Sequence, residues 1–246
     1  SGFSTLAEMT TPDQLAAFMN AYFDALAAAL KKHYVDVTEF HADTIMCAWL
    51  QGEPEIAKRR HAVRAAIETV EAIELFALAR GGLTLNPRIG LQDGHFYLGH
   101  TGGGGRLAYS ILGDPANTAA RLESLNKHLG THILASDSVL RGLDDVLTRP
   151  LGRFQLKGRA EATSLAEVLA LAADATSEQH QLCARFAEGL SAFQEHRWQR
   201  ACELFEGILA DWPQDGPARF YGQRCAQILA EGEDAPDLDV MKMDMK

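Results

Sequence analysis

The chain has 246 residues, 47% of them hydrophobic, which is enough to bury one large core and form a smaller appendage. The formal net charge of −10 argues against broad binding to nucleic acid, because such binding requires a basic surface that neutralises phosphates. No segment approaches the ~20 apolar residues of a membrane span, and the first residues lack the pattern of a signal peptide. We therefore expect no nucleic acid partner and no membrane contact from this segment.

The four cysteines are Cys47, Cys183, Cys202 and Cys225, and they lack the paired spacing of a metal site. A disulfide framework is not expected in a chain of this size, so the sequence predicts reduced thiols and a cytoplasmic location. Because the chain begins at Ser1 rather than at Met, we expect a fragment, with the cytoplasmic part of a membrane-anchored sensor as one origin.

Turn residues and the spacing of apolar residues predict alternating helices and strands up to about residue 170. A helix begins at Thr11 and Pro12, and two strands within 35–50 form a hairpin around the polar residues 41–44. A helix is predicted at 55–79, followed by strands at 88–91, 95–100 and 107–112. A second helix is predicted at 114–129, followed by strands at 132–135, 152–157 and 164–170. This alternation predicts an α+β fold in which helices cover a sheet.

From about residue 172 the strand pattern ends and helical spacing continues. Gly189, Ala201, Phe205 and Pro213 resemble the small and aromatic positions of a tetratricopeptide helix pair. An arbitrary amphipathic helix pair is the alternative. One such unit cannot bury its own apolar face, so we expect the tail to dock on the preceding domain or on a protein partner.

The change in pattern divides the chain into three parts. We expect a catalytic domain at residues 1–171, a helical tail at 172–232 and a disordered or frayed terminus at 233–246. The last part is acidic, carries methionines and shows no periodicity.

The most specific stretch is RLAYSILGDPANTAARLESLNKHLGT at 106–131, which closely resembles the signature of class III adenylate and guanylate cyclases. Further segments agree with this family in order and spacing, so the resemblance covers nearly all of residues 1–170. They are GFSTLAEMTTPDQLAAFMNAYF, VTEFHADTIMCAW, RIGLQDGHFYLGHTG and FQLKGR. The resemblance implies a ferredoxin-like domain with an antiparallel-dominated sheet flanked by helices. It also implies a head-to-tail homodimer that converts a nucleoside triphosphate into a 3′,5′-cyclic monophosphate and pyrophosphate.

In this reaction the ribose 3′-oxygen attacks the α-phosphorus, so metals and fixed cations must stabilise charge on the phosphoryl oxygens. Asp43, at the predicted hairpin tip, matches the family's second metal aspartate, and two Mg²⁺ or Mn²⁺ ions per site are implied. The alternative for Asp43 is a turn-forming role. The family's first metal aspartate would stand two positions before Ser1, so this chain alone is expected to be weakly active or inactive.

Asn117 and Arg121 are four residues apart on a predicted helix, which places both on one face. They match the family's transition-state pair, in which the asparagine orients the ribose and the arginine stabilises the phosphate. Lys157 matches the lysine that meets the terminal phosphates. The alternatives are a surface ion pair for Arg121 and a solvated strand residue for Lys157.

Two positions of the family select the base, and here they hold Glu39 and Ser110. An ionised glutamate only accepts hydrogen bonds, so it suits the N1–H and N2–H donors of guanine and faces the adenine N1 lone pair unfavourably. Ser110 can donate to guanine O6, but its hydroxyl also accepts. The pair favours GTP over ATP, while an exposed strand-end carboxylate is the alternative for Glu39.

Three readings of function remain open. The first is a guanylate cyclase, and the second is an adenylate cyclase with an atypical base pocket. The third is a degenerate nucleotide-binding or dimerisation module, which the missing aspartate supports, as does Ala42 at a position where the family usually has glycine. A protein partner for the helical tail is a further expectation.

Overall fold

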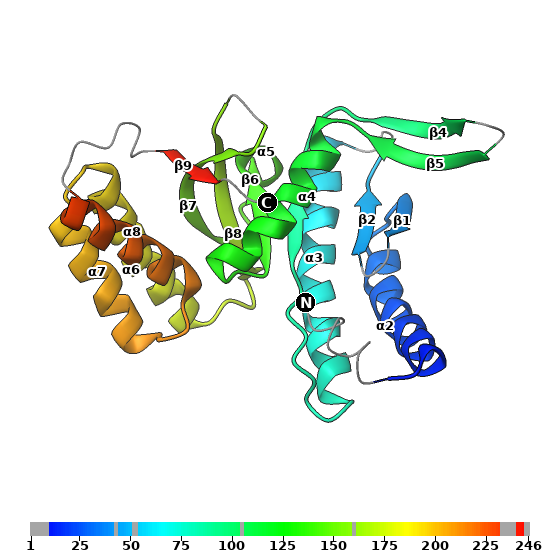
Figure 1. Cartoon of the computed structure of the whole chain (residues 1–246), viewed down its shortest axis with the longest axis horizontal. Coiled ribbons are helices and arrows are strands. Elements are labelled where there is room, and N and C mark those ends of the chain that lie inside the picture. The colour runs from blue at the N-terminus through cyan, green and yellow to red at the C-terminus, as the bar shows by residue number, and fades with distance from the viewer. Residues whose placement is uncertain are drawn as a thin grey trace. The chain divides into compact units, whose positions relative to one another are not determined.

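The structure, a computed structural model, shows seven helices and nine strands in the part of the chain that it describes (Figure 1). The described residues are 10–41, 44–50, 54–103, 106–158, 161–231 and 240–243. The chain divides into two compact units, Ser1–Ile89 with Asp93–Asn117, and Gly90–Gln92 with Thr118–Lys246. Each unit has its own apolar cluster. None of the described helices is long and apolar enough to cross a membrane.

Helix α2 (Pro12–Lys32) begins where the sequence predicts. Thr11 and Gln14 form a capping box, in which the Thr11 hydroxyl accepts from the Gln14 N–H and the Gln14 side chain accepts from the Thr11 N–H. Proline at the first helical position fixes a helical φ without the loss of a hydrogen bond.

The core of the first unit forms between α2 and α3 (Glu55–Leu78). Each helix contributes buried side chains to this core, namely Tyr22, Leu26, Ile73 and Phe76. Phe76 meets both Phe18 and Tyr22 edge to face, at centroid distances of 5.3 and 5.7 Å. Such pairs add specific geometry to the burial of apolar area, so the two helices are fixed to each other.

Two antiparallel hairpins complete the first unit. Strands β1 (Val37–His41) and β2 (Thr44–Ala48) pair from Val37 opposite Ala48 to His41 opposite Thr44, which confirms the predicted hairpin. Its tip, residues 42–43, lies outside the described residues. Strands β4 (Tyr97–Gly103) and β5 (Arg106–Leu112) form the second hairpin.

The second unit contains a five-stranded sheet in the order β3-β6-β8-β7-β9. Its strands are β3 (Ile89–Leu91), β6 (Ile133–Ser136), β7 (Val146–Leu156), β8 (Thr163–Leu171) and β9 (Val240–Met243). Strand β8 pairs antiparallel with both β6 and β7, whereas β9 is parallel to β7. Helices α4 (Asp114–Leu129) and α5 (Asp137–Leu140) precede and follow β6. The mixed sheet flanked by helices confirms the predicted α+β fold.

The tail consists of α6 (Ser177–Gln194), α7 (Trp198–Asp211) and α8 (Gly216–Glu231), one helix more than the predicted pair. Its apolar side chains join the same buried cluster as those of α4 and β7. The hydroxyl of Tyr221 on α8 donates to the Leu151 carbonyl, which lies at a register shift of β7. The tail therefore docks on the sheet of its own unit, as Figure 1 shows for α6 and β7.

A buried charge cluster joins this sheet to the tail. Arg149 on β7 donates to Glu167 Oε2 on β8 at 2.9 Å through Nε and 2.5 Å through Nη2. It also donates to Asp215 Oδ2, in the turn before α8, at 2.6 Å. Burial works to lower the pKa of Arg149, but Glu167 and Asp215 outweigh it and hold the pKa above its ordinary value. Arg149 is therefore a permanent cation between two acceptors.

The end of the chain differs from the sequence prediction. Residues 233–246 were predicted to be frayed, whereas Val240–Met243 forms β9 along the edge of β7. The four residues VMKM are too few to show a period, and their strand conformation depends on a partner edge that the local sequence does not reveal.

We predict that Arg149→Met lowers the free energy of unfolding by about 3–5 kcal/mol, because it leaves Glu167 and Asp215 as buried carboxylates without their cation. Denaturant unfolding measures this loss. The matched control is Arg200→Met, which breaks an exposed pair with Glu203 and should cost less than about 1 kcal/mol. Equal losses for the two variants would contradict the role of the buried cluster.

Candidate functional site

The two predicted base-reading residues are neighbours in the first unit. Glu39 lies on β1 and Ser110 on β5, and both are partly buried. Glu39 Oε1 accepts a hydrogen bond of 2.8 Å from the backbone N–H of Ile111. This bond directs the carboxylate to the strand segment that carries Ser110. The arrangement can present carboxylate acceptors and a hydroxyl group to one ligand edge.

The hairpin that carries Glu39 is fastened at both strands. At the base of the hairpin, Trp49 Nε1 donates to the His33 carbonyl at 2.8 Å, and Leu50 N–H donates to Asp36 Oδ2 at 2.7 Å. On β1, the Phe40 ring packs edge to face on Phe23 of α2 at a centroid distance of 5.0 Å. These contacts connect the position of Glu39 to the end of α2.

A charged cluster stabilises that end of α2. Glu68 on α3 pairs with Lys32 Nζ at 2.9 Å and with His33 Nε2 at 3.0 Å. Burial works to raise the pKa of Glu68, but the hydrogen bonds from Lys32 and His33 lower it overall. The carboxylate therefore stays ionised to a lower pH than an ordinary glutamate.

The predicted transition-state pair lies on α4. Asn117 and Arg121 are four residues apart, so they share one face of the helix. Asn117 is exposed and Arg121 is partly buried. The helix lies hard against β3, because a Cβ at Gly90 would stand 2.0 Å from the Ala119 carbonyl oxygen. Only glycine allows this approach, which fixes the height of α4 over the sheet.

Lys157 lies in the turn directly after β7, and the next residue of this turn lies close to Arg121. Gly158 has φ +76°, and a Cβ there would lie 3.3 Å from Arg121 Nη2. The turn that carries Lys157 therefore lies beside the guanidinium of Arg121. Within the described ranges neither cation is held by a carboxylate. Two local cations suit a polyphosphate, which a chain of net charge −10 would otherwise repel.

The predicted metal ligand cannot be placed in this arrangement. Asp43 lies outside the described residues, as do Ala42 and the first nine residues. In the described part of the chain, no three His, Cys, Asp or Glu side chains gather in a way that could hold a metal ion. All four cysteines are free thiols, as predicted, and burial raises the pKa of Cys47 to about 12, which keeps this thiol neutral.

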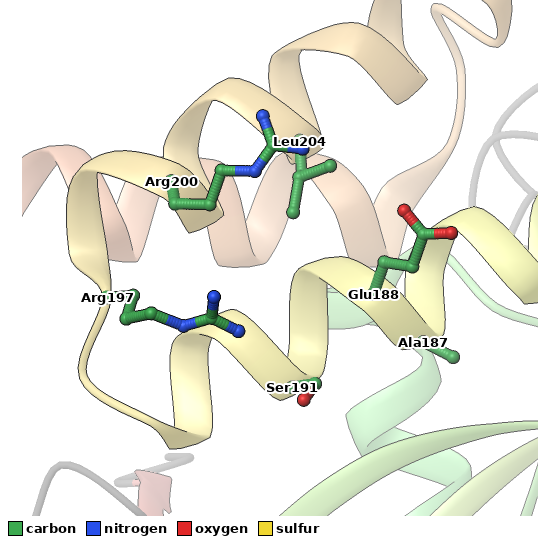
Figure 2. Close-up of a pocket in the computed structure, with 6 residues that line it drawn as sticks. All are labelled: Ala187, Glu188, Ser191, Arg197, Arg200 and Leu204. Atoms are coloured by element: carbon green, nitrogen blue, oxygen red, sulfur yellow. The ribbon is translucent and has the colours of Figure 1, made fainter.

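A hollow of about 440 Å³ lies on the tail, and none of the residues that line it is a predicted site residue (Figure 2). It is lined by Ala187, Glu188, Ser191, Arg197, Arg200 and Leu204. Its two arginines pair with glutamates, Arg197 with Glu195 at 2.8 Å and Arg200 with Glu203 at 3.6 Å. Its cations are thus already engaged, so this hollow is a poorer place for a triphosphate than the Lys157 turn.

The model of the family "Adenylate and Guanylate cyclase catalytic domain" matches residues 1–167 of the chain. The chain belongs to this family. The match includes every predicted site residue. It ends just before the tail helices, which begin at Ser177.

Curated relatives of this cyclase domain include both activities. It is 33% identical over 171 residues to Adenylate cyclase 1 of Rhizobium meliloti (strain 1021). This match covers 68% of this chain and 26% of that protein. It is 30% identical over 167 residues to human Retinal guanylyl cyclase 1, which covers 64% of this chain and 14% of that protein. The chain thus spans about a quarter or less of these two relatives.

Solved structures show the same fold. The guanylate cyclase domain of RhGC from Catenaria anguillulae, in complex with GTP, has a TM-score of 0.59 and 26% identity. The match covers 70% of this chain and 92% of that chain. The adenylyl cyclase CyaB from P. aeruginosa also has a TM-score of 0.59, at 22% identity, over 72% of this chain and 90% of that chain. The predicted class III cyclase fold is therefore confirmed.

Three features of the cyclase site could not be named from the sequence. The Ile111 N–H is a backbone group, so no side-chain pattern predicts that it holds Glu39. Gly90 sets the distance between α4 and β3, and Gly158 allows the turn beside Arg121. Only Gly158 left a signal, because it follows the predicted phosphate lysine within LKGR.

We predict that Glu68→Gln lowers the free energy of unfolding by no more than about 1 kcal/mol at pH 7, because the Lys32 and His33 pairs are partly exposed. The folded-state pKa of Glu68 is lowered, so its contribution is complete above the unfolded-state value of about 4.3 and is lost as the pH falls through the folded-state value. Urea unfolding between pH 7 and pH 3 should show that the free energies of unfolding of the unaltered chain and the variant become equal as the pH falls. Glu74→Gln, at an exposed position on the same helix, is the control and should show no such convergence.

Proposed function

We propose that this domain is a guanylate cyclase that converts GTP into 3′,5′-cyclic GMP and pyrophosphate. The observation that supports the base choice is the hydrogen bond from Ile111 N–H to Glu39, which holds an acceptor-only carboxylate next to Ser110. Guanine presents N1–H and N2–H donors to such a group, whereas adenine presents the lone pair of N1. The Ser110 hydroxyl donates to guanine O6.

The phosphate chemistry is assigned to the second pair of residues. The 3′-oxygen of the ribose forms a bond to the α-phosphorus and releases its proton, while the bond from that phosphorus to the bridging oxygen of pyrophosphate breaks. Arg121 stabilises the charge that develops on the α-phosphoryl oxygens, and Lys157 meets the terminal phosphates. Asn117, one helical turn before Arg121, orients the ribose. The short distance between the Lys157 turn and Arg121 supports this division of roles.

Asp43 is proposed as the metal ligand of this chain. Its carboxylate is a donor that Mg²⁺ or Mn²⁺ accepts, and two ions per site follow from the resemblance. Bound ions would neutralise the triphosphate and lower the barrier to departure of pyrophosphate. The resemblance implies a further aspartate as the second protein ligand of these ions, so the assays require a chain that includes such a residue.

The active site is proposed to form between two copies of the chain, as the family resemblance implies. One copy supplies Asp43, and its partner supplies the base-reading, ribose and phosphate residues. In a symmetric head-to-tail dimer this gives two equal sites.

The main alternative is an adenylate cyclase with an atypical pocket. Its support is that Adenylate cyclase 1 of Rhizobium meliloti (strain 1021) is more similar to this chain, at 33% identity, than human Retinal guanylyl cyclase 1 is, at 30%. Assays with GTP and ATP, each with Mg²⁺ or Mn²⁺, separate the two activities. The absence of a cyclic product from both would favour a degenerate nucleotide-binding module.

We propose the boundaries 1–171 and 172–232 for the catalytic domain and the tail, and a tetratricopeptide-like helix pair at the start of the tail. Gly189 on α6 and Ala201 and Phe205 on α7 are all buried. A Cβ at Gly189 would lie 2.8 Å from the Phe205 ring, so the small and aromatic positions meet as the likeness requires.

We predict that Arg121→Ala and Asp43→Ala chains are each inactive and recover activity when mixed. Random pairing makes half of the dimers mixed, and each mixed dimer has one intact site, so about one quarter of the unaltered activity should return. The measurement is cyclic nucleotide production. The control mixes Arg121→Ala with Asn117→Ala, which lie on the same side of the shared site and should not recover. Recovery in both mixtures, or in neither, would argue against the shared site.

We predict that the double change Glu39→Lys and Ser110→Asp moves the preference from GTP towards ATP by at least about tenfold in kcat/KM, because lysine donates to adenine N1 and aspartate accepts from the 6-amino group. Competition between the two triphosphates measures this ratio. Glu71→Lys, with the same charge change at an exposed position on α3, is the control and should leave the ratio unchanged. A double variant that still prefers GTP would show that Glu39 and Ser110 do not read the base.

A further inference from the structure

Strand β9 lies on the edge of the sheet at the strand that leads into the Lys157 turn. It pairs parallel to β7 in four steps, from Arg153 opposite Val240 to Leu156 opposite Met243. The paired stretch of β7 therefore ends one residue before Lys157. Figure 1 shows β9 in red along β7.

The strand is fixed by burial as well as by pairing. Met241 is 6% exposed and belongs to the apolar cluster of the second unit. Its partner Phe154 is fully buried, and Leu156 is 1% exposed. Without β9 this edge of the end of β7 would be unpaired next to fully buried residues of the core. The stretch before Lys157 would then be free to bend or fray.

The turn that follows β7 lies close to Arg121. Gly158 approaches the Arg121 guanidinium so closely that a single added carbon would lie 3.3 Å from Nη2. Arg121 is itself carried by α4, whose Leu122 and Leu125 are fully buried in the same cluster. The distance between the two cations thus depends on how firmly the end of β7 is held.

We propose that β9 is a positioning element for the triphosphate subsite, and that Met241 anchors it so that the Lys157 turn stays beside Arg121. The proposal for β9 rests on the proposed function, in which Lys157 binds the terminal phosphates of the substrate. The segment acts through β7 and does not touch the substrate. Release of β9 should therefore weaken polyphosphate binding while leaving the chemical step largely intact.

The test compares Met241→Asp, which places a charge in the core, with the conservative Met241→Leu. We expect Met241→Asp to weaken the binding of inorganic tripolyphosphate about tenfold by calorimetry and to raise the KM for GTP by a similar factor, with kcat within about twofold. Met241→Leu should keep the tripolyphosphate affinity and the KM for GTP of the unaltered chain. Leu229→Asp, the same type of change at a position 45% exposed on α8, is the control and should change neither.

A double-mutant cycle separates positioning from general loss of structure. In a Lys157→Ala chain, Met241→Asp should weaken tripolyphosphate binding by no more than about twofold further, because the group that it positions is already gone. Hydrogen exchange should show faster exchange at the amides of Arg153–Leu156 in Met241→Asp.

Three outcomes would overturn the positioning role: unchanged tripolyphosphate affinity in Met241→Asp, a full additional loss in the Lys157→Ala background, or no binding of tripolyphosphate by the unaltered chain. Failure of the proposed function is a separate result, since it is the absence of cyclic product with either nucleotide from a chain that includes the second metal aspartate. The β9 proposal would survive that result if the tripolyphosphate cycle behaves as expected.

Discussion

The buried guanidinium of Arg149 is the constraint on which the second unit depends. Its acceptors come from distant parts of the chain, Glu167 on the neighbouring strand and Asp215 in the turn before α8. A buried ion cluster adds little net stability compared with apolar residues of the same size, but it strongly disfavours any arrangement that separates its members. Arg149 thus selects one docking of the tail on β7. Since Lys157 directly follows β7, the tail and the turn that is proposed to bind phosphate are attached to the same strand.

In the first unit a different interaction connects the fold to specificity. The Glu39 carboxylate on β1 accepts a hydrogen bond from the Ile111 N–H on β5. In a wider sheet, the carbonyl of a neighbouring strand would accept this bond. The bond couples two hairpins and at the same time aims Glu39 at the segment around Ser110. A group that the fold needs for hydrogen bonding is therefore also the group proposed to read the base. Such a side chain is pre-oriented, so little entropy is lost when a ligand binds.

The sequence predicted what depends on local pattern and missed what depends on distant partners. Thr11 and Pro12 mark the start of α2, and the polar residues between apolar runs mark the β1–β2 hairpin, because caps and turns are chosen locally. The first half of β7 was missed, since Arg149 and Pro150 break the apolar pattern there, and Arg149 is buried only because Glu167 and Asp215 meet it. The site residues were named from the family resemblance. The hydrogen bond that orients Glu39 comes from the backbone N–H of Ile111, which no side-chain pattern encodes, whereas Gly158 beside Arg121 was visible only as the glycine after Lys157.

Helix α4 is the element through which the core can influence catalysis without a contact to substrate. Leu122, Leu125 and Leu129 form a stripe that is fully buried in the second unit. This stripe fixes the rotation of the helix about its own axis, because any turn would expose leucines to water. The rotation in turn decides where Asn117 and Arg121 point. The base selection proposed for Glu39 and the phosphate handling proposed for Arg121 and Lys157 therefore depend on separate sets of packing contacts. Substitutions in one set should change nucleotide preference and substitutions in the other should change turnover, with nearly independent effects on the free energy of the transition state.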